Sequence, residues 1–201
     1  MKNFKIVVGL LVALLMFSGF WSTKSDREIK NEERKNRFIE QQSRYKVNNE
    51  TLNLLYKQVP EVKKKLLNSY GYATFTNVGV SMILFSVESG KGLAHNNRSG
   101  VNTYMNMASG GLGIGLGVRD FRAIFLFKNK KVFDNFVNSG WEANAQADMA
   151  ASYDESGGSV GGATTIANGV TLYKMTQDGL MIQATVQGTK YYKDENLNKY
   201  F

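Results

Sequence analysis

The sequence predicts an α+β fold in which a curled antiparallel β-sheet, a barrel or a roll, is covered by helices from the N-terminal part of the chain. Three observations predict this class. The chain has 201 residues, 43% of them hydrophobic, which is enough for one sizeable core. Glycine is abundant, with 20 residues, whereas proline occurs once. Beyond residue 72, short strand-like segments follow one another with little helix between them.

The first 21 residues have the pattern of an export signal. Lys2 and Lys5 precede an apolar stretch over residues 6–21. This stretch is slightly short for a membrane span, which needs about 20 residues, and no clean small-residue cleavage site follows it. We therefore expect residues 1–21 to be a signal peptide or an N-terminal membrane anchor. The protein would then be an exported bacterial protein, periplasmic or anchored to the membrane by its N-terminus.

Residues 22–49 mix charges of both signs and predict a charged helical tether, either a solvated helix or a loose linker. Apolar residues then recur at intervals of three and four, which indicates the buried stripe of a helix: Leu52, Leu55, Val59, Val62 and Leu66. Proline is disfavoured inside a helix. We therefore expect one helix to end near Gln58 and a second to begin at Pro60, with Gly71 as its C-cap.

Beyond the helices, alternation and turn residues predict eight strands at 72–78, 80–87, 101–107, 111–118, 121–127, 141–149, 169–175 and 180–187. One helix is expected near residues 129–138. Hairpin turns are expected at the sequences E-S-G-K-G, N-N-R-S-G and Q-D-G, and a mobile loop at residues 152–165.

Residues 111–118 alternate glycine with branched aliphatic residues, so one face of the expected strand is bare backbone. The spacing does not fit a dinucleotide fingerprint, because Leu116 stands where the third glycine would be needed. The bare face either allows another element to pack closely or leaves space for an acyl chain. Close packing is favoured, since glycines inside strands most often mark bends and close approaches.

The composition argues against enzyme chemistry. No cysteine occurs, which excludes thiol nucleophiles, disulfides and thiolate metal sites, and His95, the only histidine, lies in an expected turn. The sequence around Ser159 matches G-x-S-x-G, but a nucleophile elbow needs a preceding strand, a following helix and a downstream histidine. We expect no catalytic residue, no metal and no cofactor.

The net charge of +8 is concentrated in residues 22–70, which carry +5, whereas residues 71–201 carry +1. A basic N-terminal part suggests an anionic membrane or a nucleic acid as partner, and export makes nucleic acid the poorer choice. Taken alone, the run Lys63–Lys65 is better explained as a solvated helix face.

Five segments occur in a distinctive order. They are P-E-V-K-K-K-L-L-N-S-Y-G-Y-A-T-F from Pro60, A-S-G-G-L-G-I-G-L-G from Ala108, F-L-F-K-N-K-K-V-F-D-N-F from Phe125, S-G-W-E-A-N-A-Q-A from Ser139, and G-L-M-I-Q-A-T-V-Q-G-T-K from Gly179. This series resembles the SYLF domain, also called the Ysc84 family of lipid-binding proteins, over roughly residues 50–201. The chain departs from the family at Gly115-Leu116, where relatives usually carry glutamine, and at Thr76-Asn77.

The resemblance implies a non-enzymatic domain that binds acidic phospholipids through basic groups of its N-terminal helical part. On matching positions, these groups are Lys57, Lys63, Lys64 and Lys65, and the implied partner is an anionic phospholipid membrane. The alternative is an envelope protein-interaction or scaffold module that has a protein partner and does not bind lipid directly. An enzyme is the third and weakest hypothesis.

Overall fold

The computed structural model describes residues 24–81, 86–111, 117–142, 163–176 and 189–199. The chain forms two compact units, Met1–Phe38 and Ile39–Phe201. The predicted signal or anchor at residues 1–21 lies outside the described residues. Among the residues that are described, no helix combines the length and the apolar character needed to cross a membrane.

Helix α2 (Asp26–Gln58) begins with a capping box. The backbone amide of Glu28 donates to the Ser25 hydroxyl, and the Glu28 carboxylate accepts from the Ser25 amide, which satisfies two free donors at the helix start. The helix continues without interruption through residue 50, where we expected the tether to meet the domain. Its residues from Ile39 onward belong to the second compact unit, and Arg44 and Asn48 are buried there.

The break at Pro60 is confirmed. Helix α2 ends at Gln58, and a short helix, α3 (Val62–Asn68), follows. All five residues of the predicted apolar stripe are buried. Gly71 was expected to be the C-cap of α3, and this is wrong. Ser69 occupies that position, and Gly71 begins the first strand.

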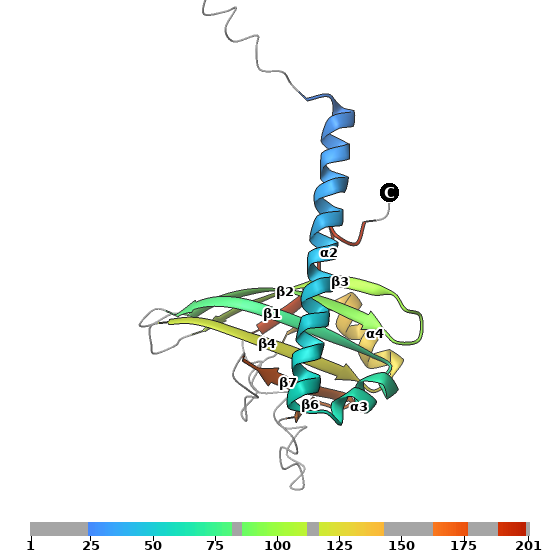
Figure 1. Cartoon of the computed structure of the whole chain (residues 1–201), viewed down its shortest axis with the longest axis vertical. Helices are drawn as coiled ribbons and strands as arrows, with labels where there is room; N and C mark the ends of the chain where they lie inside the picture. The colour runs from blue at the N-terminus through green and yellow to red at the C-terminus, as the bar shows by residue number, and fades with distance from the viewer. Residues whose placement is uncertain (1–23, 82–85, 112–116, 143–162, 177–188, 200–201) are drawn as a thin grey trace, which may run out of the picture. The chain divides into compact units, whose positions relative to one another are not determined.

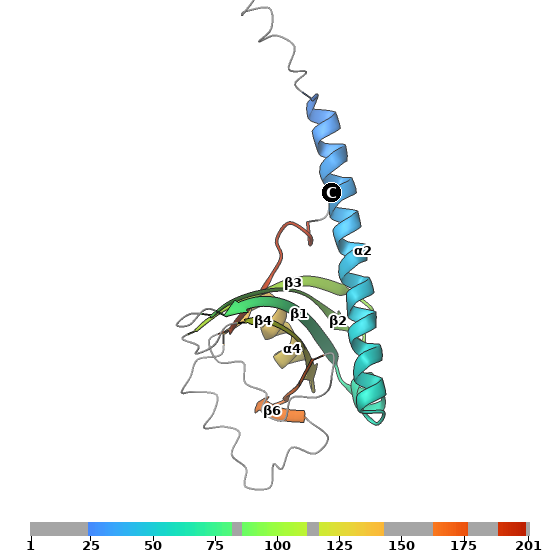
Figure 2. The ribbon, with the colours of Figure 1, turned by 60° about the vertical axis from the view of Figure 1, so that its left-hand side comes forward.

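The predicted fold class is confirmed, since the second unit is a mixed α+β structure with a curled antiparallel sheet (Figures 1 and 2). Its described strands are β1 (Gly71–Ser81), β2 (Ser86–Asn96), β3 (Asn102–Gly111), β4 (Gly117–Phe127), β5 (Trp141–Glu142), β6 (Ala163–Ala167), β7 (Val170–Met175) and β8 (Thr189–Lys193). They lie in the order β5-β8-β3-β2-β1-β4-β7-β6, and all neighbours are antiparallel.

Helices cover both faces of the sheet. Side chains alternate along β1, so that Tyr72 packs under α2 and α3, whereas Ala73 and Phe75 enter the core on the opposite, concave face. The concave face is covered by α4 (Lys130–Ser139), which lies inside the curve of the strands (Figure 2). This is the helix expected at residues 129–138. Asn129 caps it, its side chain accepting from the Val132 amide at 3.1 Å.

The expected turn at Glu88–Gly92 is wrong, because these residues lie inside β2. The glycines make room for neighbours: a β-carbon on Gly92 would overlap the Phe75 ring, and one on Gly90 would come within 2.6 Å of Met107 Cγ. The turn at Asn96–Gly100 is confirmed, with Gly100 at a φ of 71° between β2 and β3. The third expected turn, at Gln177–Gly179, lies outside the described residues.

The single strand expected at residues 111–118 is also wrong. Gly111 ends β3 and Gly117 begins β4, and these two strands run in opposite directions because β3 is antiparallel to β2 and β4 is antiparallel to β1. The alternating residues 112–116 lie outside the described residues, so neither explanation of the bare glycine face is tested.

The remaining strand predictions have mixed outcomes. The segments at 121–127 and 169–175 match β4 and β7, and β5 begins at the expected Trp141. β6 lies partly in the segment that was expected to be a loop, and β8 follows the strand expected at residues 180–187, which lies outside the described residues.

Candidate functional site

Helix α3 presents its three consecutive lysines to solvent. Val62 and Leu66, four residues apart, are buried against the sheet and fix the orientation of this short helix. Lys63, Lys64 and Lys65 occupy the positions between these anchors, and all three are exposed. The pattern of two buried residues around three lysines therefore forms a cationic surface on α3.

The four lysines that the resemblance implied are all exposed, and they lie on the end of α2 and on α3. Lys57 lies in the last turn of α2, and Lys63 lies beside the same turn, with its Nζ 5.9 Å from the centre of the Tyr56 ring. Lys65 also lines a hollow, described below. None of the four lysines forms an ion pair with another described residue.

An apolar side chain stands next to these charges. Leu67 is 61% exposed, and it follows Lys63 by four positions and Lys64 by three. Residues at these spacings are neighbours on a helix surface. Lysines beside an exposed leucine form an amphipathic surface that suits the boundary between water and lipid. We name this surface, made of Lys57, Lys63, Lys64, Lys65 and Leu67, the lysine surface.

Lys65 lines an open hollow of about 630 Å³ between the end of α3 and the β6–β7 hairpin. Lys128 lines the same hollow, as do Asn68 and Thr171. Lys128 is held there by the backbone: its amide donates to the Gly169 carbonyl, and the Tyr70 amide donates to the Phe127 carbonyl. No local pattern points to Lys128, since it lies far from the α3 lysines in the chain and only the strand pairing brings it to this place.

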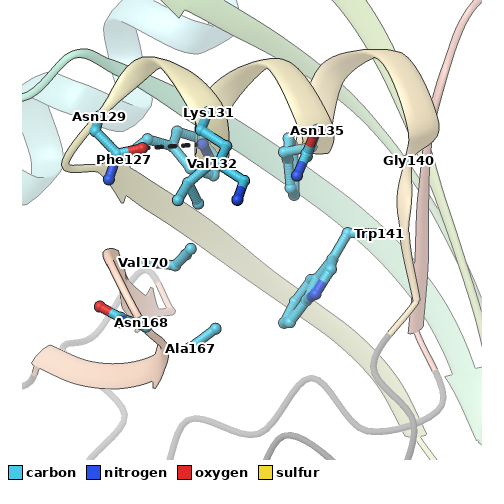
Figure 3. Close-up of a pocket in the computed structure, with 11 residues that line it drawn as sticks. Phe127, Asn129, Lys131, Val132, Asn135, Gly140, Trp141, Ala167, Asn168 and Val170 are labelled. Carbon is cyan, nitrogen blue, oxygen red and sulfur yellow. Dashed lines mark hydrogen bonds between the residues drawn. The ribbon is translucent and has the colours of Figure 1, made fainter.

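A second hollow, of about 420 Å³, lies beside α4 (Figure 3). Its walls come from α4, from Trp141 at the start of β5 and from the β6–β7 hairpin. Figure 3 shows Lys131 and Asn135 on the helix facing Ala167 and Val170 across the hollow, with Trp141 at one end. Phe127 and Phe136, both buried, also line it.

Gly140 determines where Trp141 lies. It ends α4 with a φ of 72°, and a β-carbon there would lie 2.7 Å from the backbone oxygen of Tyr191. Only glycine adopts this conformation in this space without strain. The chain consequently turns directly from α4 into β5, and the Trp141 ring packs 6.0 Å from the Tyr191 ring.

A polar network centred on the buried Arg44 joins α2 to the segment that carries Asp194. The Arg44 guanidinium donates to the Met105 carbonyl at 2.6 Å, to the Asp194 carboxylate at 2.8 Å and to the Glu40 carboxylate at 3.1 Å. Lys91 also donates to Glu40, at 2.8 Å. Because every charged group here has a partner, we assign this network to the scaffold.

The charges in this network affect proton binding. Burial opposes the ionisation of Asp194, but hydrogen bonds from the Leu197 amide and Asn106, with the charge of Arg44, outweigh it and lower the pKa of its carboxyl group. Burial likewise opposes ionisation of Glu40, but Lys91 and Arg44 outweigh it and lower its pKa. Both carboxylates are therefore stabilised in their charged form.

The residues considered for enzyme chemistry, His95 and Ser159, do not form a catalytic group among the described residues. His95 lies at the end of β2 rather than in a turn, with its Nδ1 2.6 Å from Asn102 Oδ1 and its ring against Tyr72. Ser159 lies outside the described residues. Within the described ranges, no group of three or more histidine, aspartate or glutamate residues could hold a metal ion.

Comparison with known proteins adds one similarity. The chain is 32% identical over 145 residues to Beta cell expansion factor A of Aeromonas veronii, an alignment that covers 72% of this chain and 54% of that protein. The chain thus spans about half the length of this curated relative. No family model matches the sequence. The sequence is therefore similar to Beta cell expansion factor A over most of its own length.

Proposed function

We propose that the chain is a member of the SYLF domain family and binds the surface of membranes that contain acidic phospholipids. The lysine surface would make the contact, with the ammonium groups close to lipid phosphates and the Leu67 side chain at the edge of the hydrocarbon. The protein would act without catalysis. Export by residues 1–21 would bring it to the bacterial envelope, in the periplasm or attached to the membrane by these residues.

The observation that carries the proposal is the exposure of Lys63, Lys64 and Lys65 together with Leu67 on one short helix that is anchored by two buried residues. Lysines close to an anionic membrane contribute about 1 kcal/mol each. Leucine contributes about 1.5–3 kcal/mol when its side chain passes fully from water to an apolar phase. Together these contributions are sufficient for reversible binding to a membrane.

The sequence resemblance supports the same proposal, because the lysine run falls at the position from which the SYLF family is inferred to bind lipid. The ordered series of five segments also extends over the part of the chain that forms the sheet and α4.

Vesicle flotation tests the proposal. The full chain is mixed with vesicles of phosphatidylcholine alone or with added phosphatidylglycerol, and the fraction that floats is measured. Any contribution of the apolar residues 6–21 is expected with both kinds of vesicle, so the difference between them reports on charge. The test variant replaces Lys57, Lys63, Lys64 and Lys65 with glutamine. A matched control replaces Lys46, Lys190, Lys193 and Lys199, which carry the same total charge.

We expect the wild type and the control variant to prefer anionic vesicles, and the test variant to lose this preference at least tenfold. The control is informative because it removes the same charge from α2, from β8 and from the segment after β8, at positions outside the lysine surface. Equal binding to both vesicle types, or equal losses in the two variants, would contradict the proposal. Specific protein partners that remain bound in detergent would then favour the scaffold alternative.

A further inference from the structure

The hollow beside α4 is lined by apolar and polar side chains in similar measure, and its one cation is Lys131. Phe127, Phe136 and Val170 line the hollow and are buried. Trp141, which also lines it, is only partly buried. Hollows of this size, mostly apolar with a few polar groups, are typical of sites for small molecules. The apolar part of this lining can contact a hydrocarbon chain, and the polar part can contact a charged head.

Lys131 supplies the cation. Its side chain extends from α4 toward the space between the helix and the β6–β7 hairpin (Figure 3). The preceding lysine, Lys130, forms an ion pair with Asp134, one turn later on the same helix. Lys131 forms no ion pair or hydrogen bond with another described residue, so its charge is not compensated within that part of the protein.

Two amides stand at the same rim. Asn135, one turn after Lys131, and Asn168, in the β6–β7 turn, both line the hollow and are exposed. Within the described residues, neither side chain has a hydrogen-bond partner. A carboxylate or phosphate accepts hydrogen bonds from both ammonium and amide groups. The rim can therefore bind an anionic head while the walls cover an attached hydrocarbon chain.

We propose that this hollow is a binding site for a single-chain anionic amphiphile, such as a fatty acid or a lysophospholipid. The hydrocarbon chain lies along Val170, Phe136 and Trp141, and the anionic head contacts Lys131. This site is separate from the lysine surface, and its ligand is a single molecule taken from solution rather than a membrane. Its test therefore needs no vesicles, and failure of vesicle binding leaves it unaffected.

Fluorescence titration with dodecanoate, below its micelle concentration, tests the site. The chain has two tryptophans, so the variant Trp21→Phe makes Trp141 the only reporter. We expect saturable binding with a shift of the Trp141 emission to shorter wavelength. We also expect affinity to rise from octanoate to dodecanoate, and acetate to bind at least tenfold more weakly than dodecanoate.

Two neighbouring variants separate this site from general charge attraction. Lys131→Gln is expected to weaken dodecanoate binding about fivefold, the upper range for an exposed ion pair, and to leave the neutral 1-dodecanoylglycerol unchanged. Lys130→Gln removes the same charge one position earlier and should change affinity less than twofold. Ala167→Met, which fills the hollow, should weaken both ligands.

Three results would overturn the proposal: no saturable binding of dodecanoate, acetate binding as tightly as dodecanoate, or equal effects of the two lysine variants. The chain-length series on the otherwise unchanged protein keeps the test decisive if the Ala167→Met variant does not fold.

Discussion

Gly92 shows how one missing side chain is used in the core. It lies opposite Phe75 in the pairing of β1 with β2, and the Phe75 ring occupies the space where a β-carbon would be. The same ring packs 4.7 Å from the Tyr191 ring. A side chain at position 92 would therefore displace an aromatic group that joins two parts of the core.

We predict that Gly92→Ala lowers the free energy of unfolding by about 1–3 kcal/mol, the usual cost of overpacking a core. Urea denaturation followed by circular dichroism measures the change. Ser89→Ala, at an exposed position of the same strand, is the control and should alter the free energy by less than about 0.5 kcal/mol. A Gly92→Ala variant as stable as the control would mean that the Phe75 ring moves aside at no cost.

Leu67 allows the apolar part of the proposed membrane contact to be tested separately. We predict that Leu67→Ser weakens binding to anionic vesicles about fivefold, or about 1 kcal/mol, since the partly exposed side chain can gain only part of the full transfer energy of leucine. Stability should not change, because the side chain is already 61% exposed. Flotation and a thermal melt give the two measurements.

The neighbouring Leu66 provides the contrast. It is only 2% exposed, so Leu66→Ala should destabilise the domain by about 2–5 kcal/mol. If Leu67→Ser lowered stability in the same way, its effect on vesicle binding would no longer indicate a membrane contact.

Among the elements, the contact of α2 with the C-terminal segment predicts a dependence on acid. The pKa of Asp194 is lowered in the folded state, so its ionised form contributes stability above the unfolded value near 3.8. This contribution is lost as the pH falls below that value through the lower folded pKa. Glu40, with an ordinary value of 4.5, acts in the same direction.

We predict that Asp194→Asn lowers the free energy of unfolding at pH 7 by about 1–3 kcal/mol, because a hydrogen bond to a charged group is lost. The variant should also lose less stability than the wild type between about pH 5 and pH 2, since one titrating group has been removed. Urea denaturation at a series of pH values measures both effects. Parallel pH curves for the two proteins would show that Asp194 does not contribute to acid unfolding.

Local sequence patterns predicted the helices and strands that have a clear apolar period or a proline break. The apolar stripe from Leu52 to Leu66 and the break at Pro60 predicted the two N-terminal helices, and the helix expected near residues 129–138 is α4. Glycine gave ambiguous signals. Gly90 and Gly92 resembled a turn in the sequence. The side chains that need the space beside them, Met107 and Phe75, lie on other strands. β8 was missed because its alternation, T-K-Y-Y-K, is short and charged.

For the whole molecule, the distribution of charge predicts how the proposed membrane binding depends on salt. We expect affinity for anionic vesicles to fall at least tenfold as NaCl rises from about 0.05 M to about 0.5 M, because the screening length shortens over this range. The variant with the four lysines of the lysine surface replaced should show a flatter dependence. An affinity that does not change with salt would indicate that apolar contact dominates.

The candidate sites could be predicted only in part from the sequence, because part of each site depends on how the strands pair. The exposure of Lys63–Lys65 follows from local helical spacing, so the sequence was sufficient for it. The approach of Lys128 to Lys65 depends on the pairing of β1 with β4, in which Gly71 lies opposite Phe127. The approach of Trp141 to Ala167 depends on the pairings that place β5 and β6 at the two edges of the curled sheet. No local pattern encodes those pairings.

The ion pair between Arg44 and Asp194 joins residues that are 150 positions apart. Contacts of such long range form late, because the intervening chain must first be brought together. During synthesis, Arg44 leaves the ribosome long before its partner exists, so an N-terminal fragment holds a cation that is destined for burial and still lacks Asp194. The burial of Arg44 in α2 is thus complete only once the segment that carries Asp194 has been made and has packed against it.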